Sequence, residues 1–119
     1  MDAHRYRESN LRAYDGPLAE RYDDWLPVRF LRVWEMDDFV LRMMGAGIEE
    51  LTILDVGCGT GRLLQRLREA GATRLCGIDV AAAVVEVSRA RLDDASVDLR
   101  VADAEDRIPW ADGFFDVVA

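Results

Sequence analysis

One short run of residues constrains the fold of this chain more than any other. It reads Ile53-Leu54-Asp55-Val56-Gly57-Cys58-Gly59-Thr60-Gly61, an apolar strand pattern with an acidic residue followed by three alternating glycines. An amphipathic helix pattern comes next, with Leu63, Leu64 and Leu67 on its inward face. Glycine permits the positive φ and the close backbone approach that a turn around a ligand requires. The run therefore predicts a strand–turn–helix unit that cradles a nucleotide-type ligand, with an ordinary strand-to-helix turn as the alternative.

The spacing of the glycines separates two classes of nucleotide site. The dinucleotide fingerprint is G-x-G-x-x-G, whereas the third glycine of this chain comes one place early and Arg62 stands where that glycine belongs. A nicotinamide-dependent oxidoreductase is therefore the weakest of the functions that a glycine turn suggests.

Strand and helix patterns alternate after residue 50. The predicted strands are Leu51–Val56, Arg74–Asp79, Val97–Val101 and Phe114–Ala119, and the predicted helices are Arg62–Ala70 and Ala82–Leu92. This alternation predicts an α/β fold with a parallel sheet and right-handed crossovers. Residues 1–48 carry helix patterns instead, the second of them over 28–44 with Gly45 and Gly47 as its stop. We therefore expect an N-terminal helical segment, 1–48, followed by an α/β domain, 49–119.

Composition excludes several classes of protein. The chain has 119 residues and a net charge of −8, which disfavours a nucleic-acid partner because an acidic surface repels phosphate. Two cysteines suggest no disulfide framework, and no metal-ligand spacing is present. Neither a signal peptide nor an apolar run of membrane-spanning length is found. These features predict a cytoplasmic protein with no membrane partner.

Two acidic residues end the strands that follow the glycine turn. Asp79 lies about 20 positions after the turn, where doubly wound folds place the carboxylate that accepts hydrogen bonds from both ribose hydroxyls. Asp103 follows the third predicted strand. The alternatives are that Asp79 caps the next helix and that Asp103 is a solvated loop residue.

These elements together resemble the class I S-adenosylmethionine-dependent methyltransferases. The acidic residue two places before G-x-G-x-G is similar to the first motif of that family, and the stretch Ile108-Pro109-Trp110-Ala111-Asp112-Gly113-Phe114-Phe115-Asp116-Val117-Val118 is similar to its fourth. The resemblance covers about residues 51–119. It implies a Rossmann-like parallel sheet flanked by helices in three layers (α/β/α), with strand order 3-2-1-4-5-7-6. Since the chain reaches only the fourth strand, the C-terminal half is expected to be incomplete.

The resemblance also implies roles for individual residues toward S-adenosyl-L-methionine. The first motif would pass close to the methionine part of the cofactor through Gly57, Cys58, Gly59 and Gly61. The side chain of Cys58 is expected to be a small buried group rather than a nucleophile. Asp55 would face the amino group of the cofactor.

The later motifs would hold the nucleoside. Asp79 would bind the ribose and Val80 would pack on the adenine, while Asp103 and Ala104 would bind the adenine edge. Tyr22 and Tyr14 are candidates for a lid over the cofactor. The catalytic residues of the family follow the fourth strand, so they are unknown for this chain.

The function that the resemblance implies is transfer of a methyl group from S-adenosyl-L-methionine, leaving S-adenosyl-L-homocysteine. The acidic charge favours a small-molecule acceptor. The alternatives are a non-catalytic module or fragment that binds either molecule, and an aminopropyltransferase. The apolar segment 114–119 is expected at an open sheet edge, where it favours a homo-oligomer, and Trp110 is expected to be a packing residue rather than part of a substrate cage.

Overall fold

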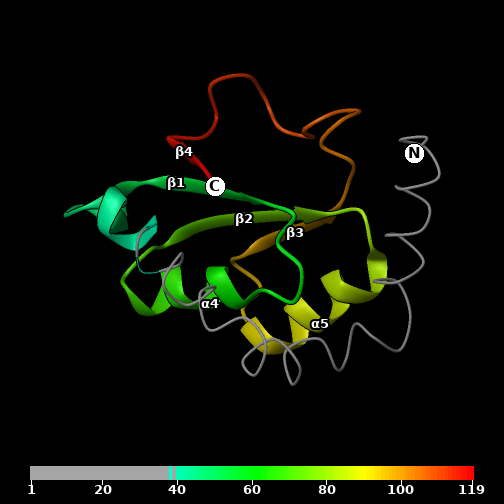
Figure 1. Ribbon diagram of the computed structural model, residues 1–119, viewed down its shortest axis with the longest axis horizontal. Helices are drawn as coiled ribbons and strands as arrows, with labels where there is room; N and C mark the ends of the chain where they lie inside the picture. The colour runs from blue at the N-terminus through cyan, green and yellow to red at the C-terminus, as the bar shows by residue number, and fades with distance from the viewer. Residues whose placement is uncertain (1–37, 39) are drawn as a thin grey trace.

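The computed structural model describes residue 38 and residues 40–119, which are drawn in colour in Figure 1. The described N-terminal part is helical at residue 38 and over 40–44, in agreement with the end of the helix predicted over 28–44. Gly45 and Gly47 follow with φ of +67° and +90°, so they end the helix as expected. The short 3-10 helix η1 (Ile48–Glu50) then leads into the sheet. No helix within the described residues is long and apolar enough to cross a membrane.

The sheet has the predicted parallel α/β arrangement. Its strands are β1 (Thr52–Val56), β2 (Arg74–Asp79), β3 (Asp98–Val101) and β4 (Val117–Val118). Helix α4 (Arg62–Glu69) joins β1 to β2, and α5 (Ala82–Leu92) joins β2 to β3. The spatial order is β3-β2-β1-β4 and all three pairings are parallel. This order matches the start of the strand order that the family resemblance implies, and element ends differ from the predictions by one residue at most, β4 excepted.

Both helices lie on the same face of the sheet (Figure 1). Ile53 of β1, Leu64 and Leu67 of α4, and Val85 of α5 are all fully buried in this layer. Gly77 of β2 explains how closely α4 can approach, because a Cβ at that position would lie 2.9 Å from Leu64 Cδ1. Because Gly77 has no side chain, α4 can pack closely against the sheet at this position of β2.

The opposite face of the sheet is covered differently. Leu54, Cys76 and Ile78 form its buried part, and Trp110 and Phe115 pack against them. Both aromatic residues belong to the segment 102–116, which connects β3 to β4. Within the described residues, this face is therefore covered by an irregular segment, while α4 and α5 form the helical layer on the other side.

The fourth strand is shorter than predicted. The segment 114–119 was expected to be a strand, but only Val117–Val118 pairs as one. The rings of Phe114 and Phe115 lie edge to face, 5.0 Å apart, and Phe115 lies 5.2 Å from Trp110 in the same geometry. Edge-to-face contacts between aromatic rings are favourable, and they stabilise the irregular path of the chain at residues 114–115. Pairing with β1 begins only at Asp116, whose N–H donates to the Thr52 carbonyl at 2.9 Å.

Candidate functional site

The turn after β1 adopts the conformation that its glycines predict. Gly57, Gly59 and Gly61 have φ of +70°, +54° and +83°, a region that residues with a Cβ rarely adopt. The turn is held to the sheet by the Cys58 N–H, which donates to the Ile78 carbonyl at 2.9 Å, and it closes with a bond of 3.0 Å from the Gly61 N–H to the Cys58 carbonyl. Backbone hydrogen bonds within the protein thus hold the turn in this conformation.

The three glycines face different surroundings. A Cβ at Gly57 or Gly59 would meet nothing within 4 Å, so the backbone at both positions borders open space. A Cβ at Gly61 would lie 2.3 Å from the hydroxyl of Ser88 on α5. We call this open backbone at Gly57 and Gly59 the glycine cradle, since a ligand could approach it closely. The structure gives Gly61 a packing role that the sequence did not reveal.

Asp79 joins the glycine turn to the next strand and helix. Its carboxylate accepts a hydrogen bond from the Gly59 N–H through Oδ2 and one from the Ala81 N–H through Oδ1, both at 3.0 Å. The N-cap of α5 is Ala81, which has no side-chain cap bond, so Asp79 does not cap this helix as the alternative expected. Its bond to the Ala81 N–H instead fixes the backbone just before α5. An ionised carboxylate can accept about four hydrogen bonds, so acceptor capacity for a ribose diol remains.

Asp55 is a buried carboxyl group beside this turn. It lies on the helix-bearing face of β1 and is only 6% exposed. Burial, and secondly the negative charge of Asp79, raise the pKa of Asp55 from its ordinary 3.8 to about 7. A cationic group of a ligand placed here would favour ionisation of Asp55, which suits the predicted contact with a cofactor amino group.

Asp103 and Ala104 follow β3 at the same edge of the sheet. The Ala102 N–H donates to the Asp79 carbonyl at 3.0 Å, which brings the start of this segment to the end of β2. Asp103 Oδ1 accepts a hydrogen bond from the Glu105 N–H, so Asp103 also shapes its own turn. Ala104 is exposed and can be approached from solvent.

Of the four other residues predicted near the cofactor, the structure describes Val80 and Cys58. Val80 is exposed at the end of β2, where a flat apolar ligand group could pack on it. Cys58 is buried, and burial together with the charges of Asp55 and Asp79 raises the pKa of its thiol to about 12, which favours the protonated thiol at neutral pH. Tyr14 and Tyr22 lie outside the described residues, as does most of the predicted helical segment 1–48.

The arrangement fits S-adenosyl-L-methionine. Ligands of parallel α/β sheets bind outside the carboxyl ends of the strands, and three neighbouring strands here bring Asp55, Asp79 and Asp103 to that edge. Carboxylates suit a ligand that carries a sulfonium, an ammonium and a ribose diol. The cradle at Gly57 and Gly59 leaves room for its methionine part.

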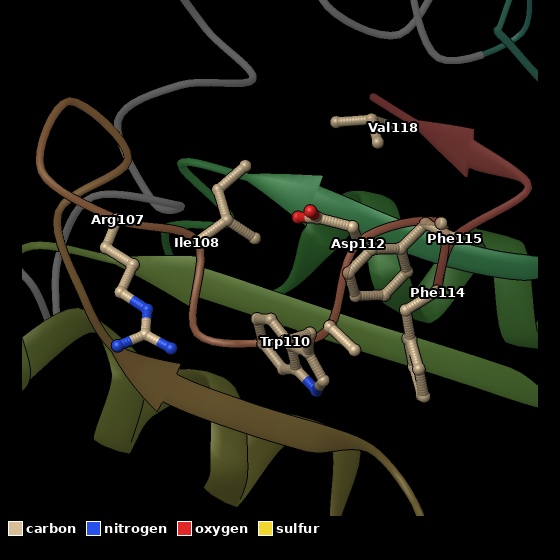
Figure 2. Close-up of a pocket in the computed structure, with 9 residues that line it drawn as sticks. Arg107, Ile108, Trp110, Asp112, Phe114, Phe115 and Val118 are labelled. Carbon is tan, nitrogen blue, oxygen red and sulfur yellow. The ribbon is translucent and has the colours of Figure 1, made fainter.

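A second hollow is lined by a different set of residues. A cavity of about 610 Å³ lies between the 107–115 segment and β4, and Figure 2 shows Trp110, Phe115 and Val118 around it. None of the predicted cofactor-binding residues lines it. Trp110 packs on the ring of Phe115, in agreement with its expected structural role.

Sequence reasoning missed several residues that shape the site. Ser88, fully buried and facing Gly61, gave no local signal beyond its place on the inner face of α5. Gly77 could have been noticed, since a glycine inside a strand marks a close approach. Asp98 and Arg100 of β3 bind each other and also bind the 102–116 segment. Their spacing in the sequence gives no indication of the contact with that segment.

Comparison with known proteins identifies the family. The family described as "Methyltransferase domain" matches residues 53–119, more than half of the chain. The ubiquinone biosynthesis O-methyltransferase of Thiobacillus denitrificans is 41% identical over 106 residues, which are 85% of this chain and 44% of that protein. The ribosomal protein L11 methyltransferase of Thermotoga maritima is 39% identical over 67 residues, 56% of this chain and 25% of that protein.

A solved structure shows the same fold. The methyltransferase described as putative in its complex with the Haloferax volcanii Trm112 methyltransferase activator has a TM-score of 0.72 and 28% identity. The match covers 91% of this chain and 45% of that chain. This chain therefore spans less than half of the length of each of these three proteins.

The comparisons correct one prediction. A small-molecule acceptor was expected from the acidic charge, but the relatives include a methyltransferase that acts on a ribosomal protein. Net charge describes the surface as a whole and does not determine what a local acceptor site binds. The small-molecule acceptor is therefore not supported.

The other findings agree with one another. The matched family, the parallel sheet with its order β3-β2-β1-β4, and the glycine turn flanked by carboxylates all point to the same assignment. The chain belongs to the methyltransferase domain family, among the class I methyltransferases whose cofactor is S-adenosyl-L-methionine.

Proposed function

We propose that this chain binds S-adenosyl-L-methionine at the carboxyl edge of β1, β2 and β3, and that the protein transfers the methyl group of this cofactor to an acceptor. The observation that carries the proposal is the position of the Asp79 carboxylate, held by the Gly59 and Ala81 N–H groups next to an open glycine cradle. The Asp79 carboxylate would accept hydrogen bonds from two ribose hydroxyls. Its orientation is already fixed, so binding does not lose affinity to the ordering of this side chain.

Each residue of the site has a distinct task in this proposal. Asp79 accepts hydrogen bonds from the ribose diol, and Asp55 lies toward the ammonium group of the methionine part. Val80 packs on the adenine ring. Asp103 accepts a hydrogen bond from the adenine amino group, and the Ala104 N–H donates to a ring nitrogen.

The transfer itself is an in-line displacement. A lone pair of the acceptor attacks the methyl carbon of the sulfonium, the carbon–sulfur bond breaks, and its electron pair stays on sulfur as the neutral thioether of S-adenosyl-L-homocysteine. The acceptor then loses its proton to solvent or to a base. Positioning and exclusion of water supply most of the rate enhancement in such a reaction.

The binding step is tested by calorimetric titration with three ligands. The first is S-adenosyl-L-homocysteine, the second is a version of this molecule without the two ribose hydroxyls, and the third is NADH as a control. We expect the loss of the diol to weaken binding to the unaltered protein about ten- to hundredfold, because it removes charge-assisted hydrogen bonds. In Asp79→Ala the two homocysteine ligands should bind almost equally.

This double comparison separates recognition from damage. Asp79→Ala also removes the bonds to Gly59 and Ala81, so a general loss of affinity alone would be uninformative, whereas a changed ratio between the two ligands is specific. Glu69→Gln, an exposed change at the end of α4 that also removes one carboxylate, serves as the matched control. An unchanged ratio in Asp79→Ala would refute ribose recognition by this residue, and preferential binding of NADH would refute the cofactor.

The transfer step is tested by incubation with radiolabelled cofactor and a panel of protein and small-molecule acceptors. Label that moves to an acceptor supports a methyltransferase. Tight binding of both cofactor forms with no transfer to any acceptor would favour a module that binds without catalysis.

A further inference from the structure

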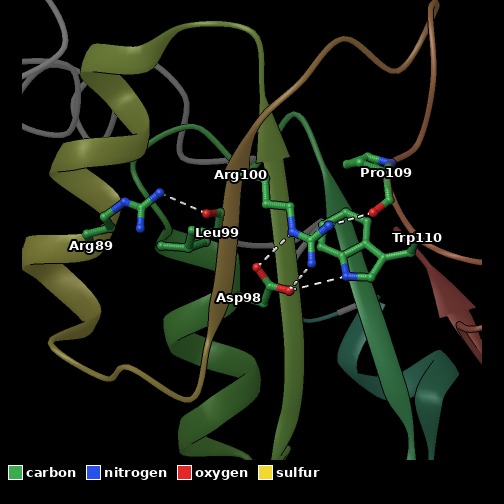
Figure 3. A network of polar contacts seen from close by, with 6 residues as sticks. All are labelled: Arg89, Asp98, Leu99, Arg100, Pro109 and Trp110. Carbon is green, nitrogen blue, oxygen red and sulfur yellow. Dashed lines mark hydrogen bonds and ion pairs between the residues drawn. The ribbon is translucent and has the colours of Figure 1, made fainter.

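A cluster of polar contacts on β3 lies outside the residues assigned to the cofactor. Asp98 and Arg100 are two residues apart on this strand, so their side chains share one face. They pair in register with Cys76 and Ile78 of β2, which belong to the face opposite the helices. Arg100 binds both carboxylate oxygens of Asp98, from Nε at 3.0 Å and from Nη2 at 2.8 Å (Figure 3).

The same two side chains hold the segment that follows β3. Arg100 Nη1 donates to the Pro109 carbonyl at 2.5 Å, and the guanidinium lies 4.2 Å from the centre of the Trp110 ring. Trp110 Nε1 donates to Asp98 Oδ2 at 3.2 Å. We call these four residues, Asp98, Arg100, Pro109 and Trp110, the Arg100 clamp. A cation over an indole face and a bidentate carboxylate pair both require the planar guanidinium.

The base of the clamp is itself fixed to the helical layer. Arg89 of α5 reaches β3 and donates from Nη2 to the Leu99 carbonyl at 2.8 Å (Figure 3). The Leu99 side chain is buried among the residues that pack between sheet and helices. β3 is thus a rigid support on which the Arg100 clamp can hold a less regular segment.

The held segment contains the predicted adenine contacts. A turn over residues 103–107 is shaped by bonds from the Asp106 and Arg107 N–H groups to the Asp103 carbonyl. On its N-terminal side, Ala102 joins the turn to the end of β2. On its C-terminal side, the Arg100 clamp joins it to β3 through Pro109 and Trp110. The turn is therefore attached to the sheet at both ends.

We infer that the Arg100 clamp is a positioning device for recognition of the adenine base: it holds the 103–107 turn so that Asp103 and Ala104 face the cofactor. This inference rests on the proposed function. None of the four clamp residues is among the predicted cofactor contacts. Asp98, Arg100 and Trp110 are positioning residues, and their removal leaves the turn attached at one end, which selectively weakens recognition of the base.

The test compares three ligands in Arg100→Met and Trp110→Leu. They are S-adenosyl-L-homocysteine, S-inosyl-L-homocysteine, in which an oxo group replaces the adenine amino group, and the analogue without the ribose diol. We expect the unaltered protein to prefer the adenine ligand about tenfold, the effect of one good hydrogen bond to a carboxylate. In both variants this preference should fall by about fivefold or more, while the preference for the ribose diol stays unchanged.

Two further variants sharpen the test. Arg100→Lys keeps the positive charge but cannot form the bidentate pair, reach Pro109 and cover the indole ring at once, so we expect its adenine preference to fall toward that of Arg100→Met. Arg74→Met removes an exposed arginine at the start of β2, outside both the 103–107 turn and the clamp, and its adenine preference should equal that of the unaltered protein. Arg100→Lys also keeps the test valid if the larger change prevents folding.

The outcomes distinguish this inference from the proposed function. A protein that binds no S-adenosyl-L-homocysteine at all would refute both. Normal binding with no preference for adenine over hypoxanthine in the unaltered protein would overturn base recognition by the 103–107 turn, and with it the inference. An adenine preference that survives in Arg100→Met and Trp110→Leu would overturn the inference alone, and an equal loss of base and diol preferences would show a merely structural role.

Discussion

The buried carboxyl group of Asp55 predicts an unusual dependence of stability on pH. In the folded protein its pKa is about 7 instead of 3.8, because burial and the charge of Asp79 oppose ionisation. The folded state therefore holds one more proton than the unfolded chain between about pH 4 and pH 7. Since stability falls with pH wherever the folded state binds more protons, this group destabilises the fold progressively as pH rises through that window.

The size of the effect follows from the shift. About three pKa units at 1.36 kcal/mol per unit amount to about 4 kcal/mol of lost unfolding free energy above pH 7. Asp55→Asn has nearly the same shape and carries no charge at any pH. We expect this variant to be more stable than the unaltered protein at pH 8 by as much as about 4 kcal/mol, and the difference to shrink toward zero near pH 4.

Urea unfolding followed by circular dichroism at pH 5, 6, 7 and 8 measures this difference directly. Other carboxyl groups titrate in both proteins, so only the difference between the two curves isolates Asp55. Glu69→Gln, an exposed change at the end of α4 and outside the site, should give a curve parallel to that of the unaltered protein. The reasoning is refuted if the gain from Asp55→Asn is the same at pH 5 and pH 8.

Three other predictions concern single positions. Gly61→Ala should cost about 2–4 kcal/mol of unfolding free energy, because its Cβ would lie 2.3 Å from a buried hydroxyl of α5 at a φ of +83°. Gly59→Ala has open space around its Cβ, so the same denaturant measurement should give a cost of only about 1 kcal/mol. Asp116→Ala removes the acceptor that lies 2.8 Å from the Thr52 N–H, so the Thr52 amide should exchange with deuterium faster, and an unchanged exchange rate would contradict this role. The Cys58 thiol, with its pKa near 12, should resist a thiol reagent at pH 8 until the protein is unfolded, and rapid labelling of the native protein would show that it is accessible.

Much of the fold follows from local patterns. The alternation of short apolar strands with helix patterns predicted three of the four strands and both helices to within one residue at each end, because amphipathic periodicity reflects which side of an element is buried. The exception is 114–119, where Phe114 and Phe115 have the composition of a strand, but the ring of Phe115 packs against Trp110 and that of Phe114 against Phe115. Such a choice depends on what lies on the face of the sheet, which no local window contains.

The candidate site was predictable in outline for a similar reason. Three positive-φ glycines and an acidic residue at the end of each of the next two strands are local signals, and parallel strands bring their carboxyl ends to one edge. The contacts among these residues were not predictable. That Asp79 binds the Gly59 N–H, and that Asp55 is buried enough to titrate near pH 7, depend on register and packing.

The sequence by itself determined the glycine turn, the alternation of strands and helices, and the positions of the carboxylates along the chain. These depend on backbone freedom and on hydrophobic periodicity, which are properties of neighbouring residues. The tertiary structure alone decided that Gly61 faces Ser88 while Gly57 and Gly59 border open space, and that Arg100 holds Pro109 and Trp110. These outcomes arise where elements distant in sequence meet, because the distance between two packed surfaces is set by all the side chains between them.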